Sequence, residues 1–359
     1  MATSGNKGEW SEIYTLFRLL GEGKVHAGDA NMNKMELYYP ILNIIRQENA
    51  RYEYKPNPEA NIVVIDEDGK EYARISMSRF LEESARLFAE IKSSKGVTTI
   101  PDSEVFMNEI GCKSLKAPSG SKADIHIVIH DLRTGMTPLL GFSIKSQLGS
   151  ASTLLNAGST TNILYRLSGK DLTDDDIANI NGIENHLPRM KALFDMGCKL
   201  EYVDTPHDTF RDNLQFLDTS MPRFIAECLV ADCEESSTSK VSDVVAVVAK
   251  RNPLHYMGKN EETFYEHKMK VLLVDVALGM TPSKQWLGKY DANGGYLVVR
   301  KDGEVVCYHF YNRNDIEDYL YYNTRFERAS RSRYGFGSLY RGDDGQVYIK
   351  LNLQIRFLK

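Results

Sequence analysis

The segment ADIHIVIHDLRTGMTPLLGFSIKS, residues 123–146, carries the strongest structural signal in the chain. Two runs rich in apolar residues flank a turn around Gly135, a pattern that predicts a β-hairpin. Alternate residues of a strand share a face. The isoleucines of the first run therefore lie on one side, and the other side carries Asp124, His126, Val128 and His130. On the second run, Ser143 and Lys145 share a face, opposite Phe142 and Ile144.

A turn centred on Thr134 and Gly135 puts Asp124 opposite Lys145. A carboxylate, the Ser143 hydroxyl and an ammonium group then meet at one end of the hairpin. An aspartate oxygen can bind a hard divalent cation, and a neighbouring lysine can orient or activate a water molecule. The alternative interpretation is a partly exposed salt bridge on the face of a sheet.

The first predicted helix, residues 8–23, contains two acids with an unusual placement. Glu9 and Glu12 fall within its apolar stripe, where an ionised carboxylate is costly unless it is paired or binds a metal. Glu12 lies one turn deeper and is the stronger candidate for a functional role. Glu109 has a similar position in a short predicted helix, residues 102–111, and is a rival. The alternative is that first-turn acids interact with the helix dipole and extend into solvent.

The composition is that of a globular protein without an obvious polyanion partner. Of 359 residues, 42% are hydrophobic, and the formal net charge is -5. No apolar run is long enough for a membrane span, and residues 1–12 lack the features of a signal peptide, so we expect a cytoplasmic location. The five cysteines are scattered and form no Cys-x-x-Cys pair, which argues against a disulfide framework and a zinc site.

One local stretch departs from the acidic average. Residues 324–341, TRFERASRSRYGFGSLYR, hold five arginines against the single acid Glu327, with aromatic residues between them. The arginines are Arg325, Arg328, Arg331, Arg333 and Arg341. Because arginine forks suit phosphate oxygens and guanine edges, this segment is a candidate nucleic-acid contact. The alternative is a solvated basic loop.

The remaining pattern is mixed α and β. Apolar periodicity predicts helices over residues 78–94 and over most of residues 183–278. Hairpins are predicted at residues 61–75, with a turn at Asp68 and Gly69, and at residues 296–310 and 339–357. We therefore expect a mixed α/β (α+β) fold. A first domain would cover residues 1–165, and a helical region with C-terminal hairpins would cover residues 166–359, unless the two form one integrated domain.

Several segments resemble a known family. Ala123-Asp124 and Ser143-Ile144-Lys145 form a reduced version of the PD-(D/E)xK nuclease pattern. Three longer segments resemble signatures of the HpaII-type restriction endonucleases: NKGEWSEIY (residues 6–14), GFSIKSQLGSASTLLNA (residues 141–157) and IKLNLQIRF (residues 349–357). These are type II enzymes that cut double-stranded DNA at CCGG, and the matching segments reach both ends of the chain.

The resemblance implies a restriction-endonuclease-like core, in which helices flank a central mixed sheet, and Mg²⁺-dependent hydrolysis of phosphodiester bonds. Asp124 and Glu12 would hold Mg²⁺, while Lys145 would position the attacking water and help to deprotonate it. Gln147 follows on the same face as Lys145 and could contact metal, water or phosphate.

The chain departs from the nuclease pattern at Ser143, which stands where a second carboxylate is usual. Serine is a poor cation ligand. Some nucleases with this serine use a glutamate about a dozen residues after the lysine, but residues 152–162 contain no acid. The second carboxylate must then come from Glu12, Glu9 or Glu109.

For DNA recognition, the arginine segment is the first candidate to read the guanine edges of CCGG. A second group follows the catalytic strand and could contact phosphates or bases: Ser150, Ser152, Thr153 and Asn156. The alternative role for these four residues is to cap a following helix.

The partner implied by the resemblance is double-stranded DNA. Cutting both strands of a palindrome needs two visits by an active site, either in a homodimer or in sequence. A matching DNA methyltransferase would protect the host. Two other functions also fit the residues: a repair-type nuclease without sequence preference, and a DNA-binding module that no longer cuts. The pairing of Lys145 with Asp124 favours cutting, and the serine at 143 favours the non-cutting module.

Overall fold

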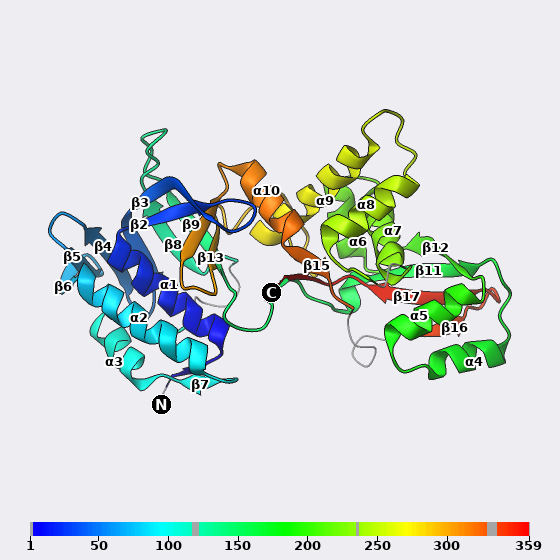
Figure 1. Ribbon diagram of the computed structural model, residues 1–359, viewed down its shortest axis with the longest axis horizontal. Coiled ribbons are helices and arrows are strands. Elements are labelled where there is room, and N and C mark those ends of the chain that lie inside the picture. Colours follow the sequence, from blue (N-terminus) through cyan, green and yellow to red (C-terminus); the bar gives the residue numbers. More distant parts are fainter. Residues whose placement is uncertain (1–2, 117–121, 235–236, 329–335, 359) are drawn as a thin grey trace. The chain divides into compact units, whose positions relative to one another are not determined.

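The computed structural model describes residues 3–116, 122–234, 237–328 and 336–358. Its internal contacts divide the chain into two compact units (Figure 1). The first unit comprises Met1–Ser152 and Tyr290–Tyr319, and the second comprises Thr153–Lys289 and Leu320–Leu358. This division differs from the single boundary predicted near residue 165, because residues 290–319 return to the first unit and add strands to its sheet.

Within the described residues, a nine-stranded mixed sheet forms the framework of the first unit (Figure 1). In spatial order its strands are β2 (Lys24–Gly28), β14 (Val305–His309), β13 (Gly295–Val299), β9 (Leu139–Ser146), β8 (Ile125–Ile129), β3 (Lys34–Gln47), β4 (Arg51–Asn57), β5 (Ile62–Glu67) and β6 (Lys70–Ser76). β13 is parallel to β9, and β14 is parallel to β2. β2 also pairs with β3, so the six strands from β2 to β3 form a closed circuit.

Two helices cover this sheet, and both are amphipathic. α1 (Lys7–Glu22) packs against α2 (Met77–Ser93) and against β9. Trp10, Ile13 and Phe17 of α1 are fully buried in the core that also contains the apolar faces of β8 and β9. α1 ends at Gly23, whose positive φ of 65° suits glycine. α3 (Pro101–Glu109) follows α2, and the short strands β1 (Ser4–Gly5) and β7 (Thr98–Thr99) pair with each other.

The second unit combines helices with two small sheets (Figure 1). Its helices are α4 (Asp174–Gly182), α5 (His186–Asp195), α6 (Asp208–Leu217), α7 (Met221–Glu234), α8 (Val241–Arg251) and α9 (Glu261–Leu278), with a 3₁₀ turn η1 (Ser159–Thr161). One sheet has the order β12 (Lys199–Asp204), β11 (Asn162–Ser168), β17 (Val347–Asn352) and β16 (Leu339–Arg341). The other has the order β10 (Thr153–Leu155), β18 (Ile355–Phe357) and β15 (Thr324–Phe326). α10 (Arg313–Tyr322) precedes β15 in the chain.

The predicted mixed α/β fold with a central mixed sheet is confirmed. The helices expected over residues 8–23 and 78–94 correspond to α1 and α2, and those within residues 183–278 correspond to α5 to α9. The three predicted hairpins are β5–β6, β13–β14 and β16–β17. Asp68 and Gly69 form the first of these turns, both with positive φ, as a tight hairpin requires. Among the described residues, no helix combines the length and the apolar character that a membrane crossing requires.

Candidate active site

The β8–β9 hairpin forms as predicted, but its register differs from the prediction by two residues. Ile125 pairs with Phe142, and His126 pairs with Gly141, so Asp124 faces Ser143 and not Lys145. The reason is the turn, which is centred one residue earlier than expected: Gly135 N–H donates to Asp131 O, and Asp131 N–H donates to Met136 O. A shift of two residues preserves the faces of both strands, so Asp124, Ser143 and Lys145 still lie on one side.

Ser143 connects the two charged groups of the hairpin. Its Oγ donates a hydrogen bond of 3.0 Å to Asp124 Oδ2, and it accepts one of 2.9 Å from Lys145 Nζ. Asp124 Oδ2 also accepts a 2.7 Å bond from the backbone N–H of Ile144. Ser143 is buried. The aspartate and the lysine are therefore held in fixed positions through one hydroxyl group.

α1 brings Glu12 to this hairpin from the opposite end of the first unit's sequence. Burial, and to a lesser extent the negative charge of Asp124, raise the pKa of Glu12 to about 8, although the charges of Arg46 and Lys145 oppose the shift. Glu12 Oε2 is buried and has no hydrogen-bond partner among the described residues. Burial lowers the pKa of Lys145, and the carboxylates of Asp124 and Glu12 oppose this change. Asp124, Glu12 and Lys145 thus form one electrostatically coupled group.

The two rival acids have other partners. Glu9 belongs to the capping box of α1, where its Oε2 accepts from the backbone N–H of Asn6 at 2.8 Å, and its other oxygen pairs with Lys116. Glu109 is about half exposed and pairs with Arg79 at 3.2 Å. Of the three acids predicted as the second carboxylate, Glu12 is the one that the structure brings to Asp124.

The carboxylates of this site suit a cation that takes only some of its ligands from the protein. Among the described residues there is no group of three or more His, Cys, Asp or Glu side chains that could hold a metal ion. The carboxyl groups of Asp124 and Glu12 do interact electrostatically, however. The bonds that Asp124 accepts from Ser143 and Ile144 both go to Oδ2, and Glu12 Oε2 has no hydrogen-bond partner among the described residues. Mg²⁺ commonly binds through one or two carboxylates and completes its octahedron with water and substrate phosphate. The residues present fit that pattern.

Gln147 is engaged by neighbouring loops. Its Nε2 lies 3.2 Å from Met32 Sδ, in the β2–β3 loop, and its Oε1 accepts from Lys301 N–H at 3.3 Å, in the β13–β14 turn. The structure thus places Gln147 beside the end of the catalytic strand without bringing it to Asp124 or Ser143.

Sequence reasoning missed two residues that surround Lys145. Tyr296 of β13 is 1% exposed, and its ring centroid lies 5.2 Å from Lys145 Nζ. Lys122 is partly buried, and its pKa is lowered by burial and by the charge of Lys145. Lys122 lies two residues before Asp124, so the alternation of a strand places both side chains on the same face. Lys122 could have been found from that spacing. Tyr296 could not, because nothing in the hairpin at 296–310 indicates which strand it pairs with.

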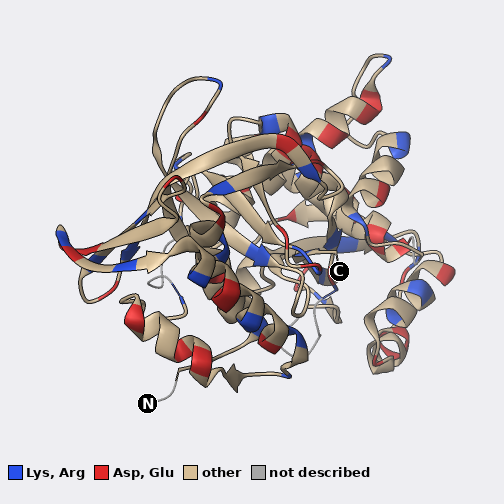
Figure 2. Ribbon diagram, turned by 60° about the vertical axis from the view of Figure 1, so that its left-hand side comes forward, with Lys and Arg blue, Asp and Glu red and all other residues tan. Residues whose placement is uncertain are grey.

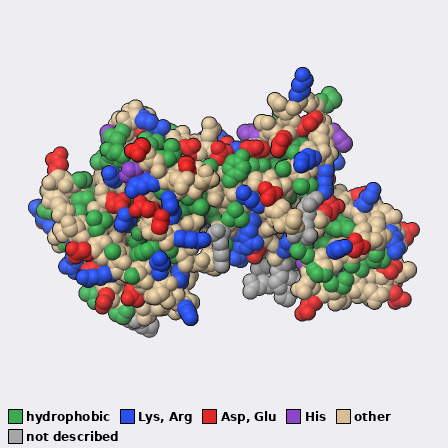
Figure 3. All heavy atoms as spheres, viewed as in Figure 1, with side chains coloured by type: hydrophobic (Ala, Val, Ile, Leu, Met, Phe, Trp, Pro, Cys, Tyr) green, Lys and Arg blue, Asp and Glu red, His purple; other side chains and the backbone are tan. Residues whose placement is uncertain are grey.

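The predicted arginine contacts are partly engaged in ion pairs within the second unit. Arg325 pairs with Glu327, Arg328 donates to Asp232 at 3.1 Å, and Arg341 donates to Asp174 at 2.8 Å. Arg331 and Arg333 lie outside the described residues. Basic and acidic residues are interspersed along the ribbon in Figure 2, and their side chains are interspersed on the face drawn in Figure 3, which agrees with the modest net charge.

The segment after β9 does not cap a helix. Ser150 and Ser152 lead into strand β10, which contains Thr153, and Asn156 follows that strand and is exposed. The helix-capping alternative for these four residues was therefore wrong, because the segment pairs with β18 instead. Their role as DNA contacts stays a prediction.

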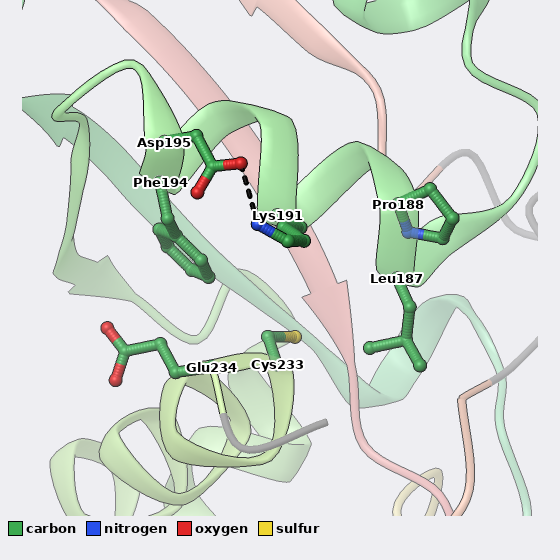
Figure 4. A pocket seen from close by; sticks show the side chains of 7 residues that line it. All are labelled: Leu187, Pro188, Lys191, Phe194, Asp195, Cys233 and Glu234. Atoms are coloured by element: carbon green, nitrogen blue, oxygen red, sulfur yellow. Dashed lines mark hydrogen bonds and ion pairs between the residues drawn. The ribbon is translucent and has the colours of Figure 1, made fainter. Parts of the chain in front are cut away.

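A cavity of about 450 Å³ lies between α5 and the end of α7 in the second unit (Figure 4). Its lining is mainly apolar, with Leu187, Phe194 and Cys233. The charged groups at its rim are paired: Lys191 with Asp195 at 2.8 Å, and Glu234 with Arg251. In the described chain, the charged residues that line this cavity are thus engaged with each other or with Arg251.

Comparison with known proteins identifies the family of the chain. A family model described as HpaII restriction endonuclease matches residues 6–357. A relative from Haemophilus parainfluenzae, described as the type II restriction enzyme HpaII, is 44% identical over 358 residues, which is 99% of each chain. No solved structure matches the chain.

Proposed function

Because this chain belongs to the HpaII restriction endonuclease family and is a type II site-specific deoxyribonuclease, we propose that it cuts double-stranded DNA at 5′-CCGG-3′ with Mg²⁺ as cofactor. The proposed sequence rests on the 44% identity to HpaII along the whole chain. Family membership also excludes the two other functions considered, a nuclease without sequence preference and a module that does not cut.

One observation supports the proposed chemistry: two carboxylate oxygens have no hydrogen-bond partner among the described residues, and their carboxyl groups interact electrostatically with each other and with an ammonium group. These oxygens belong to Asp124 and Glu12, and the ammonium group is that of Lys145. Two acids and a lysine are the groups that hydrolysis of a phosphodiester with a divalent cation requires.

Asp124 and Glu12 would hold Mg²⁺, and the bound ion would neutralise the charge that develops on the phosphate. The positive charge of the ion would also favour the ionised form of Glu12, whose pKa is about 8 in its absence. Burying this carboxylate therefore has a function: the acid is kept in the core at a cost that the cation offsets.

The other residues of the hairpin would position these groups. Ser143 and Ile144 N–H together fix Oδ2 of Asp124, which leaves Oδ1 directed to the cation. The Lys145 side chain would position the attacking water and help to deprotonate it. Ser143 thus fills the place of the usual second carboxylate as a hydrogen-bonding residue, while Glu12 supplies the charge.

DNA contact is proposed for the arginine segment and for the four residues after β9. Phosphate oxygens would have to replace the acids that now pair with Arg325, Arg328 and Arg341.

The described residues hold one site with Asp124, Glu12 and Lys145. Cleavage of both strands would then use a homodimer or two successive visits, and a methyltransferase of the same specificity would protect the host.

The test is digestion of one sequenced plasmid with the purified chain and Mg²⁺, followed by sequencing of the ends. We expect discrete ends at CCGG that disappear with EDTA and with Asp124→Asn. Discrete ends at another sequence would overturn the proposed specificity but not the site. Discrete ends that persist in Asp124→Asn would overturn the site.

A further inference from the structure

Strand β13 places a buried aromatic ring beside the catalytic lysine. β13 runs parallel to β9, and Tyr296 stands in register with Ser143. The ring of Tyr296 is 1% exposed, and its centroid lies 5.2 Å from Lys145 Nζ. The ammonium group therefore has two neighbours that can fix it: the Ser143 hydroxyl at 2.9 Å and the face of this ring.

A ring in this position stabilises the charged form of lysine. The face of an aromatic ring is negative, and its attraction for an ammonium group is strongest where water is excluded. Lysine also has a long, flexible side chain, so one hydrogen bond to Ser143 leaves the position of Nζ loosely defined. A second contact from the ring restricts the ammonium group to the side that faces Asp124.

The strand position of Tyr296 lies beside a cluster of packed aromatic residues. Tyr296 pairs with Tyr308 across β13 and β14. Tyr308 stacks on Tyr319 of α10, with ring centroids 4.0 Å apart and planes inclined by 16°. The hydroxyl of Tyr308 also donates to the backbone oxygen of Asp29 at 2.6 Å. Tyr296 thus stands in register with a residue that is held by two contacts, and its own side chain is buried.

We propose that Tyr296 is a positioning residue for DNA cleavage: its ring holds the Lys145 ammonium group at the distance from Ser143 and Asp124 that the reaction needs. The proposal rests on the proposed role of Lys145. It assigns a function to the return of residues 290–319 into the first unit, because β13 supplies one wall of a site whose charged groups come from residues 1–152.

The test compares three variants in single-turnover cleavage of a duplex that carries whichever sequence the unaltered chain cuts. Tyr296→Leu removes the ring, and Tyr296→Phe keeps it. Tyr39→Leu is the matched control, since Tyr39 is equally buried in the same sheet and no cation of the described residues lies over its ring. At saturating duplex we expect the rate constant of Tyr296→Leu to fall on the order of tenfold. Tyr296→Phe and Tyr39→Leu should stay within about threefold of the unaltered chain.

A second readout separates positioning from folding and from DNA binding. The duplex Kd, measured without divalent cation, should be unchanged in Tyr296→Leu, so that the loss appears in the rate constant alone. In a Lys145→Ala background, Tyr296→Leu should cause no further loss, because the ring acts through the lysine.

The outcomes distinguish this inference from the proposed site. If Lys145→Ala cuts as fast as the unaltered chain, the proposed site fails, and the inference fails with it. If Lys145→Ala is slow but Tyr296→Leu cuts at the unaltered rate, the inference alone is overturned. Equal losses in Tyr296→Phe and Tyr296→Leu, or in Tyr39→Leu and Tyr296→Leu, would also overturn it, since the aromatic face would then not be the cause.

Discussion

At the scale of single residues, Glu12 is an acid placed where its charge is costly. Its carboxylate lies in a helix whose neighbouring side chains, Trp10, Ile13 and Leu16, are fully buried. Its pKa is raised to about 8, mainly by burial. The pKa of this carboxyl group is 4.5 in the unfolded chain and higher in the folded chain. The free energy of unfolding is therefore highest below pH 4.5 and falls as the pH rises toward 8. At neutral pH the residue therefore destabilises the fold.

The first prediction concerns Glu12→Gln. The substitution removes the cost of taking up a proton on folding, so the first unit should gain up to about 3 kcal/mol at pH 7. It should at the same time raise the Mg²⁺ concentration needed for cleavage by roughly tenfold or more. Thermal unfolding and cleavage titrated with Mg²⁺ measure the two effects. Glu109→Gln is the control, because Glu109 is half exposed and paired with Arg79. A variant of Glu12 that lost stability and kept its Mg²⁺ requirement would contradict the assignment.

A second prediction concerns His309, which is 1% exposed, stacks on Tyr311 and packs at a tilt against Tyr39. Burial lowers the pKa of His309 to about 4. The pKa of the unfolded histidine is near 6.5. The free energy of unfolding is therefore highest above pH 6.5 and falls as the pH drops toward 4. The loss should reach about 3 kcal/mol in the first unit.

Urea unfolding at pH 7 and pH 5 measures this dependence. The chain has two tryptophans, and Trp10 reports on the first unit while Trp286 reports on the second. The urea concentration at the midpoint of unfolding, followed by Trp10 fluorescence, should differ between the two pH values. In His309→Asn this difference should be smaller. The same pH dependence with and without His309 would show that another group is responsible.

At the scale of elements, the site depends on how α1 sits on β9. Ser11, buried in α1, forms a hydrogen bond of 2.8 Å with Ser146 at the end of β9. Glu12 follows Ser11, and Lys145 precedes Ser146. This single contact therefore fixes the carboxylate that comes from the helix relative to the lysine that comes from the strand.

The third prediction is that Ser11→Ala weakens Mg²⁺ use more than it weakens the fold. Stability should fall by about 1 kcal/mol, the usual net value of one hydrogen bond, while the Mg²⁺ concentration for half-maximal cleavage should rise several-fold. Ser84→Ala is a matched control, because Ser84 is also buried in a helix but bonds only to the backbone oxygen of Leu81. Equal shifts in the two variants would argue that α1 does not set the geometry of the site.

The elements that could be predicted from sequence are those with local signals. The apolar period of α1 and α2, and the turn residues Asp68 and Gly69, determine structure within a few residues. The register of β8–β9 could not be predicted, since it depends on which residue of a long turn is central. The strands between residues 24 and 57 were missed, because β3 is partly exposed on both faces and does not alternate strictly.

The candidate site was predictable to the same extent. Asp124, Ser143 and Lys145 lie on one hairpin, so alternation alone placed them together. Glu12 could be selected among three acids only as the deepest, and the packing of α1 on β9 supplied the rest. Tyr296 lies more than 150 residues from Lys145, and sheet order, which sequence patterns do not encode, brings them together.

At the scale of the whole molecule, the first unit is discontinuous in sequence. β13 and β14 come from residues 290–319 and stand between β9 and β2 in the sheet. Without them, Phe142 and Ile144 would lose the neighbouring strand that contains Leu297 and Val299, all of them core residues. Residues 290–319 are therefore needed to complete the core that holds the β8–β9 hairpin.

The fourth prediction follows from this arrangement. A fragment of residues 1–152 should not unfold cooperatively, because one long edge of its apolar core is exposed. Joining residues 290–319 to it through a flexible linker of about 15 residues should restore a cooperative transition. Circular dichroism during heating compares the two. A fragment of residues 1–152 with a sharp transition of its own would show that the added strands are dispensable.

The central claim is that Glu12, from α1, replaces the carboxylate that Ser143 lacks. The most direct measurement is anomalous diffraction from crystals of the chain with its DNA duplex and Mn²⁺ in place of Mg²⁺. The account predicts one strong peak within roughly 2.1 Å of carboxylate oxygens of both Asp124 and Glu12. A peak that joins Asp124 to Glu9 or Glu109, or a metal bound without Asp124, would contradict it.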